Sequence, residues 1–133
     1  MRKTTLAGFA LLFGFAGVAA ADCLSPSITA AGQIRGVIVG NTVCANLGSE
    51  RWQEYHSGSG NSGALIDYKK GPSDPVDPSK TVGSWSISGG QVIYNYGSGG
   101  TYAYTLHNNG GGSYTFCGAR NIDATFRPGQ GAC

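Results

Sequence analysis

Apolar and polar residues alternate with a period of two along most of the chain between residues 42 and 126. This period is typical of β-strands, whose successive side chains point to opposite faces of a sheet. Glycine and asparagine fill the breaks in the pattern, where they supply the positive φ angles that hairpin turns need. The alternation predicts eight strands, at residues 42–45, 51–56, 64–69, 82–88, 91–96, 101–107, 113–117 and 121–126. We therefore expect a mainly β fold, either an antiparallel meander or a small eight-stranded barrel.

Two segments depart from the alternation. Residues 28–39 repeat apolar side chains at helical spacing, and Ser27 is placed to cap a short N-terminal helix there. Gly32 and Gly36 each weaken this helix by about 1 kcal/mol, and the Val-Ile-Val run that ends it suits a strand as well. Residues 71–80 contain three prolines, which lack the backbone N–H of a central strand, so we expect a loop there.

Aromatic residues follow the alternation on several strands. Tyr94 and Tyr96 share one face of their strand, as do Tyr102 and Tyr104 on the next. Neighbouring strands with aromatics at every second residue build one continuous aromatic face. A small eight-stranded barrel is either filled by its own side chains or holds one small ligand. The frequency of tyrosine among half-buried sheet residues favours the filled core.

The N-terminus has the pattern of a secretory signal peptide at residues 1–21, which leaves a single β domain at 22–133. Arg2 and Lys3 precede an apolar run that ends in three alanines. Without Arg2 and Lys3, 7 of the 9 basic residues remain against 7 acidic ones, so the mature chain is neutral. A neutral chain lacks the positive charge that nucleic acids and anionic membranes require, and no membrane anchor is expected after cleavage.

Four cysteines lie beyond the leader. In an exported chain they indicate two disulfides, and the sequence allows three pairings. We expect Cys44–Cys117, which would tie an early strand to a late one, and Cys23–Cys133, which would tie the termini. The sequence contains no Cys-x-x-Cys spacing, so it lacks the usual sign of a redox or zinc motif.

The sequence contains no strong candidate for a catalytic or metal-binding site. Trp52, Glu54 and His56 fall on one face of a predicted strand, and Glu54 with His56 would be the first acid–base pair to examine in an enzyme. No motif marks a nucleophile or a third partner, so we expect a solvated polar face around one tryptophan. His107 is expected to be exposed beside a turn. We therefore predict a non-enzymatic protein with no cofactor and no metal.

Two resemblances concern the mature chain. Its motifs NTVCA, RWQEYH, DYKKGPSDPVDP, VGSWSI and YTFC resemble those of small exported bacterial β-rich proteins of unknown function. The sequence SGGTY, from Ser98 to Tyr102, is similar to the SGxxY loop of periplasmic inhibitors of c-type lysozyme, which are small disulfide-stapled barrels. In that family the loop serine enters the lysozyme cleft, which would place Ser98 and Tyr102 at an interface. The family's second loop, a tyrosine followed by Thr-Lys-Gly, has no match here.

These observations predict a monomeric secreted or periplasmic protein that binds an unknown protein or small ligand through its loops or its aromatic face. Ser98, Tyr102 and Tyr104 are the candidate binding residues. A periplasmic lysozyme inhibitor is one alternative. A lipocalin-like carrier of a small apolar ligand is the other, because Gly83-Ser84-Trp85 resembles the Gly-x-Trp of that family, although several strands precede it here.

Overall fold

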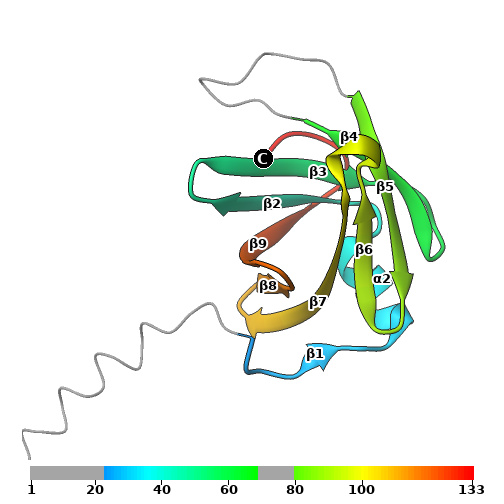
Figure 1. Ribbon diagram of the computed structural model, residues 1–133. Coiled ribbons are helices and arrows are strands. Elements are labelled where there is room, and N and C mark those ends of the chain that lie inside the picture. The colour runs from blue at the N-terminus through cyan, green and yellow to red at the C-terminus, as the bar shows by residue number, and fades with distance from the viewer. Residues whose placement is uncertain (1–22, 69–79) are drawn as a thin grey trace, which may run out of the picture.

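The computed structural model describes residues 23–68 and 80–133, and these residues form nine strands and two short helical segments (Figure 1). The helix α2 spans Ala31–Ile38, and one 3₁₀ turn, η2, spans Gly97–Gly99. The strands are β1 (Ser27–Ile28), β2 (Asn41–Leu47), β3 (Glu50–His56), β4 (Ser62–Asp67), β5 (Lys80–Ser88), β6 (Gln91–Asn95), β7 (Thr101–Gly110), β8 (Ser113–Cys117) and β9 (Asn121–Pro128). The predicted leader and residues 71–79 of the predicted loop lie outside the described residues.

The strands from β2 to β9 form a closed antiparallel barrel. Each pairs with the next along the chain, and β9 pairs back onto β2, with Val43 opposite Phe126 and Ala45 opposite Ala124. Each of the eight predicted strands is present, so the predicted eight-stranded barrel is confirmed. The two-residue β1 pairs with β7 in antiparallel orientation, with Ser27 opposite His107. It was not predicted, because two residues are too few to show a period.

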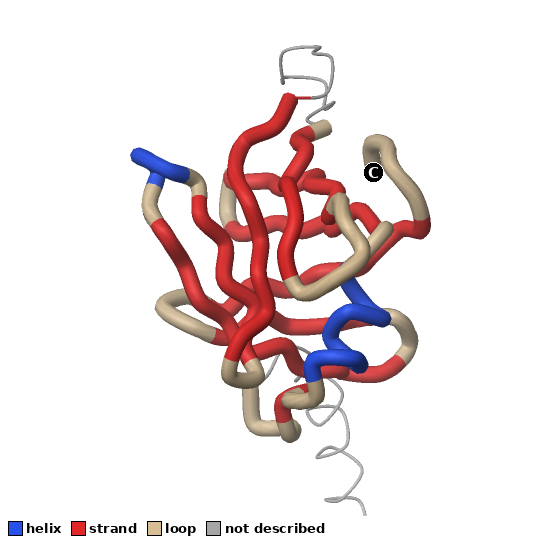
Figure 2. Tube along the Cα trace, turned by 90° about the vertical axis from the view of Figure 1, so that its right-hand side faces the viewer, coloured by secondary structure: helices blue, strands red, loops and turns tan. Residues whose placement is uncertain are grey.

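The N-terminal helix is confirmed, but its predicted start is wrong. Helix α2 begins at Ala31 after Ala30, which makes no side-chain capping hydrogen bond. Ser27 cannot cap it, because Ser27 is paired with β7 instead. The helix and η2 lie toward opposite ends of the barrel (Figure 2). Ile34 and Ile38 of the helix are fully buried in the hydrophobic core.

Side chains fill the barrel at the α2 end. Leu65, Trp85, Val92 and Leu106 are almost completely buried there together with the helix isoleucines. The Trp85 indole donates a hydrogen bond to the Ser57 carbonyl at 2.9 Å. Apolar burial of this kind stabilises the fold by about 25 cal/mol for each Å² removed from water. This end of the interior therefore agrees with the expected filled core.

The two disulfides are Cys23–Cys117 and Cys44–Cys133, so both predicted pairings are wrong. Cys44 lies on β2 and Cys117 on β8, and β9 runs between these strands. Two strand spacings separate residues by roughly 9–10 Å, which exceeds the Cα separation that a disulfide allows. Each observed disulfide instead ties one end of the described chain to a barrel strand. Disulfides of this kind persist in an oxidising compartment.

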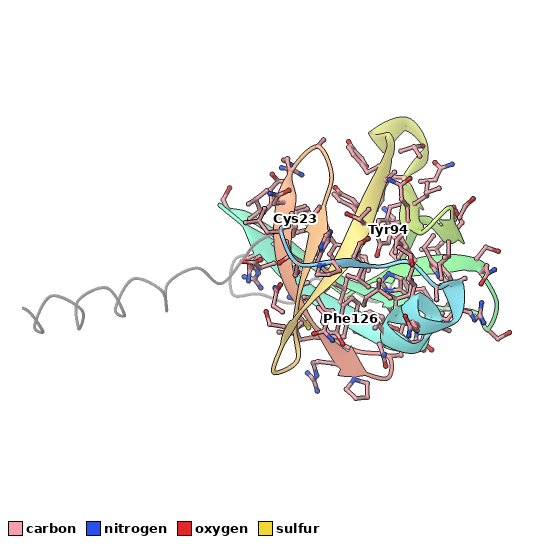
Figure 3. All side chains as sticks on the ribbon, turned by 90° about the horizontal axis from the view of Figure 1, so that it is seen from below. Cys23, Tyr94 and Phe126 are labelled. Atoms are coloured by element: carbon pink, nitrogen blue, oxygen red, sulfur yellow. A yellow bond between two sulfur atoms is a disulfide. The ribbon has the colours of Figure 1, made fainter. Side chains whose placement is uncertain are left out.

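The N-terminal segment covers a polar layer on the outside of the barrel. It runs from Cys23 across the lower end of the molecule toward α2 (Figure 3). His107 beneath it is buried, and its Nδ1 donates a hydrogen bond to the Ser25 carbonyl at 2.7 Å. Its Nε2 lies 2.9 Å from the Thr105 hydroxyl. The prediction that His107 is exposed is therefore wrong, because the segment before β1 packs over it.

Candidate functional site

The end of the barrel opposite α2 contains a cavity of about 370 Å³. All eight barrel strands contribute side chains to its lining, and it opens beside η2 and the turn that joins β8 to β9. The interior is thus filled at one end and hollow at the other. The expected filled core holds for only part of the barrel, because the side chains that point inward near the open end leave the axis unoccupied.

The predicted aromatic face lines this cavity. Rings from four strands, and from the residue that directly follows β6, line it: Trp52, Tyr94, Tyr96, Tyr102, Tyr104 and Phe116. Tyr94 and Tyr104 each pack edge-on against Phe116, with ring centroids 5.9 and 5.7 Å away. Tyr96 and Tyr102 continue the row toward the opening, at 6.2 Å. The alternation of aromatics along β6 and β7 therefore forms the cavity wall.

Two carboxylates reach the cavity from neighbouring strands. Glu54 of β3 and Asp67 of β4 are directly opposite in the strand register, and they are only 5% and 8% exposed. The Tyr96 hydroxyl donates a hydrogen bond to Glu54 at 2.7 Å. Burial, and then the charge of Glu54, raises the pKa of Tyr96, so this phenol remains a proton donor at neutral pH. Asp67 was missed from the sequence, although it is two residues from Leu65 and so shares its inward face.

His56 lies deeper than Glu54 on the same inward face of β3. It is fully buried, and its Nε2 is 2.8 Å from the Tyr94 hydroxyl. Burial lowers the pKa of His56 to about 4, against the opposing effect of the Asn41 and Glu54 backbone. The expected solvated polar face is therefore wrong. Each member of the suspected acid–base pair instead has a tyrosine partner inside the barrel.

An ion pair stands at the opening. Arg120 donates a hydrogen bond to Glu50 at 2.7 Å, and its guanidinium carbon lies 5.7 Å from the centroid of the Trp52 ring. The hydrogen bond with Arg120 lowers the pKa of Glu50 and raises that of Arg120. Neither residue was identified from the sequence, because β3 and the turn before β9 meet only in the folded barrel.

The three predicted binding residues have different environments. Ser98 is exposed on η2 and does not line the cavity, whereas Tyr104 is buried in the cavity wall. Tyr102 is 40% exposed, and its hydroxyl donates a hydrogen bond to the Gly99 carbonyl at 2.9 Å. Tyr102 therefore belongs both to the loop that carries Ser98 and to the cavity opening.

The described residues contain no group of three His, Cys, Asp or Glu side chains arranged to hold a metal ion. Within the same part of the chain, no helix is long and apolar enough to cross a membrane. The chain was compared with protein-family models, curated proteins and solved structures, and no match was found in any of the three. The site's own geometry is therefore the basis for a functional proposal.

Proposed function

We propose that the protein is an exported, non-enzymatic ligand-binding barrel that holds one small molecule in the cavity at the η2 end. The cavity carries this proposal, because about 370 Å³ falls within the size range of small-molecule sites. Its aromatic wall with a few convergent polar groups is also typical of such sites. The signal-like N-terminus and the two disulfides support export to the periplasm or the medium.

The proposal is tested by ligand-observed NMR on the mature, oxidised protein. We would screen a mixture of small aromatic fragments that includes cations, neutral molecules and anions. The variant Ala45→Phe places a ring in the cavity, since Ala45 is a buried lining residue. The matched control Ala103→Phe places the same ring on the exposed outer face of β7.

Fragments should bind the wild type and Ala103→Phe, and they should lose binding to Ala45→Phe. Thermal unfolding would establish that both variants are folded. If no fragment of any charge bound the wild type, or if Ala45→Phe bound the same fragments equally well, the ligand-binding proposal would fail.

A second candidate function, inhibition of c-type lysozyme, rests on the position of Ser98. This serine is exposed on η2, on a loop held by the hydrogen bond from Tyr102 to Gly99. We would titrate the protein against a c-type lysozyme together with Ser98→Asp. Ser88→Asp, at the exposed end of β5, is the matched control. Inhibition that only Ser98→Asp loses would support this function, and no inhibition at micromolar concentration would retire it.

A further inference from the structure

We infer that the cavity prefers a planar aromatic ligand to a saturated ligand with the same connectivity and the same polar group. This inference rests on the proposed ligand-binding function and specifies its ligand class. It is carried by the juxtaposition of aromatic rings on opposite walls of one cavity, where three of the four tyrosine hydroxyls are held by partners within the chain.

The aromatic rings lie on opposite sides of the cavity. Trp52 is on β3, whereas Tyr102 and Tyr104 are on β7. Around the eight-stranded barrel, β7 is the fourth strand from β3 in either direction, so these two strands face each other across the barrel axis. A molecule inside the cavity therefore has aromatic rings on both sides. An apolar cavity of about 150 Å³ holds benzene, so a cavity of about 370 Å³ has room for one or two rings.

Hydrogen bonds within the chain hold the polar ends of the wall tyrosines. The Tyr96 hydroxyl donates to a carboxylate at 2.7 Å, and the Tyr102 hydroxyl donates to a backbone carbonyl at 2.9 Å. The Tyr94 hydroxyl is 2.8 Å from His56 Nε2, and His56 is outside the cavity lining. Because a phenol has a single O–H donor, hydroxyls held in this way leave ring faces and edges as the surface that a ligand contacts.

The wall rings already use the contact geometry that a ligand ring would adopt. Tyr104 packs against Phe116 at an interplanar angle of 71° and against Tyr94 at 57°. Aromatic rings have negative faces and positive edges, so tilted and edge-on pairs attract each other beyond the effect of the area they bury. A ligand ring inserted among these rings gains this attraction. A saturated ring gains only the burial of its apolar surface.

The polar group of such a ligand has a place at the opening. The side chains of Arg120 and Glu50 form an ion pair there and are 45% and 53% exposed. Because an exposed ion pair contributes little to stability, Arg120 can donate a hydrogen bond to a ligand hydroxyl and Glu50 can accept one from it. Deeper in the cavity, a neutral ring leaves the hydrogen bond from Tyr96 to Glu54 in place. A neutral aromatic alcohol therefore suits both parts of the site.

The test is isothermal titration of the oxidised protein, residues 22–133, at pH 7 with 2-phenylethanol and 2-cyclohexylethanol, which share a hydroxyl and differ only in the ring. 2-Phenylethanol should bind roughly fivefold tighter. Burial of apolar area alone predicts the reverse order, because the saturated ring is the larger and more apolar one. Tyr104→Leu removes one wall ring and should reduce the preference. Tyr114→Leu is the matched control and should keep it, since Tyr114 packs against Phe126 at 5.5 Å outside the cavity lining.

Thermal unfolding would establish that each variant is folded. Trp52→Leu, on the opposite wall, provides a second test should Tyr104→Leu fail to fold, and it should reduce the preference as well. Equal or tighter binding of 2-cyclohexylethanol by the wild type would overturn the inference and leave the ligand-binding function standing. A preference for the aromatic alcohol that is unchanged in the wall variants would overturn it too. If neither alcohol bound, the inference would be wrong, and the fragment screen would decide the proposed function separately.

Discussion

Replacement of His56 by glutamine should make the stability of the protein less sensitive to acid. His56 is fully buried, and burial lowers its pKa from 6.5 to about 4. In the unfolded chain the imidazole takes up a proton as the pH falls below about 6.5, whereas in the folded protein it does so only near pH 4. The free energy of unfolding therefore falls as the pH is lowered from about 6.5 to about 4. Above pH 6.5 the imidazole is neutral in both states, so it causes no such loss there.

The size of the effect follows from the two pKa values. A difference of about 2.5 pH units corresponds to a total of about 3 kcal/mol, at about 1.4 kcal/mol per unit. Between pH 7 and pH 5 the share of His56 is about 2 kcal/mol. His56→Gln cannot be protonated, and its amide can still form a hydrogen bond with the Tyr94 hydroxyl. The acid-induced loss in the variant should therefore be smaller by about 2 kcal/mol.

The assay is urea unfolding at pH 7 and pH 5, followed by circular dichroism with the disulfides intact. Tyr94→Phe is the control, because it removes the hydroxyl partner at 2.8 Å but leaves the titrating imidazole in place. It should keep most of the pH dependence of the wild type. Equal acid sensitivity of the wild type and His56→Gln would refute the reasoning, since His56 would then take up its proton equally readily in the folded and unfolded states.

Three further predictions concern the fold. Replacing Cys44 and Cys133 together by alanine should lower the free energy of unfolding by about 4–5 kcal/mol, because the link spans 89 residues, and an unchanged urea midpoint would contradict this. Gly63→Ala should lower it by about 3 kcal/mol, because the new Cβ would lie 1.7 Å from a backbone carbonyl oxygen; Gly60→Ala has open space and should match the wild type in the same urea experiment. Burial raises the pKa of Tyr94 well above 10, so an alkaline absorbance titration should leave this phenol un-ionised until the barrel unfolds, and the protein should lose stability above pH 10 because the unfolded chain releases that proton. Ionisation of all seven tyrosines near pH 10 with the barrel intact would contradict the last prediction.

The strands were predictable because their signal is local. Alternation over four or more residues, bounded by turn residues, indicates strand and turn without knowledge of the partner strand. The same alternation predicted that Tyr94 and Tyr96 share a face, which lines the cavity. β1 could not be predicted, because two residues carry no period and are held only by their pairing with β7.

The predictions that were wrong concern features that depend on how distant strands pair when the barrel closes. The pairing of Cys44 depends on β9 lying between β2 and β8, which no local pattern reveals. Alternation placed Glu54 and His56 on one face but could not show that this face is the inner one. Polar side chains normally indicate the outer face, and here they point inward because Tyr94 and Tyr96 supply hydrogen-bond partners. The cavity volume depends on all eight strands together and has no local signal.

The two tryptophans provide the most direct test of a ligand site at the η2 end. Trp52 lines the cavity, whereas the Trp85 indole is buried in the filled end and bonded to the Ser57 carbonyl. In a ¹H–¹⁵N NMR titration of residues 22–133 with a mixture of small aromatic fragments that includes cations, neutral molecules and anions, the account predicts that the Trp52 indole N–H signal shifts with increasing ligand while the Trp85 signal stays in place. Shifts confined to Trp85 or to amides on the outer surface, or no shift at either indole, would contradict a ligand site in the barrel opening.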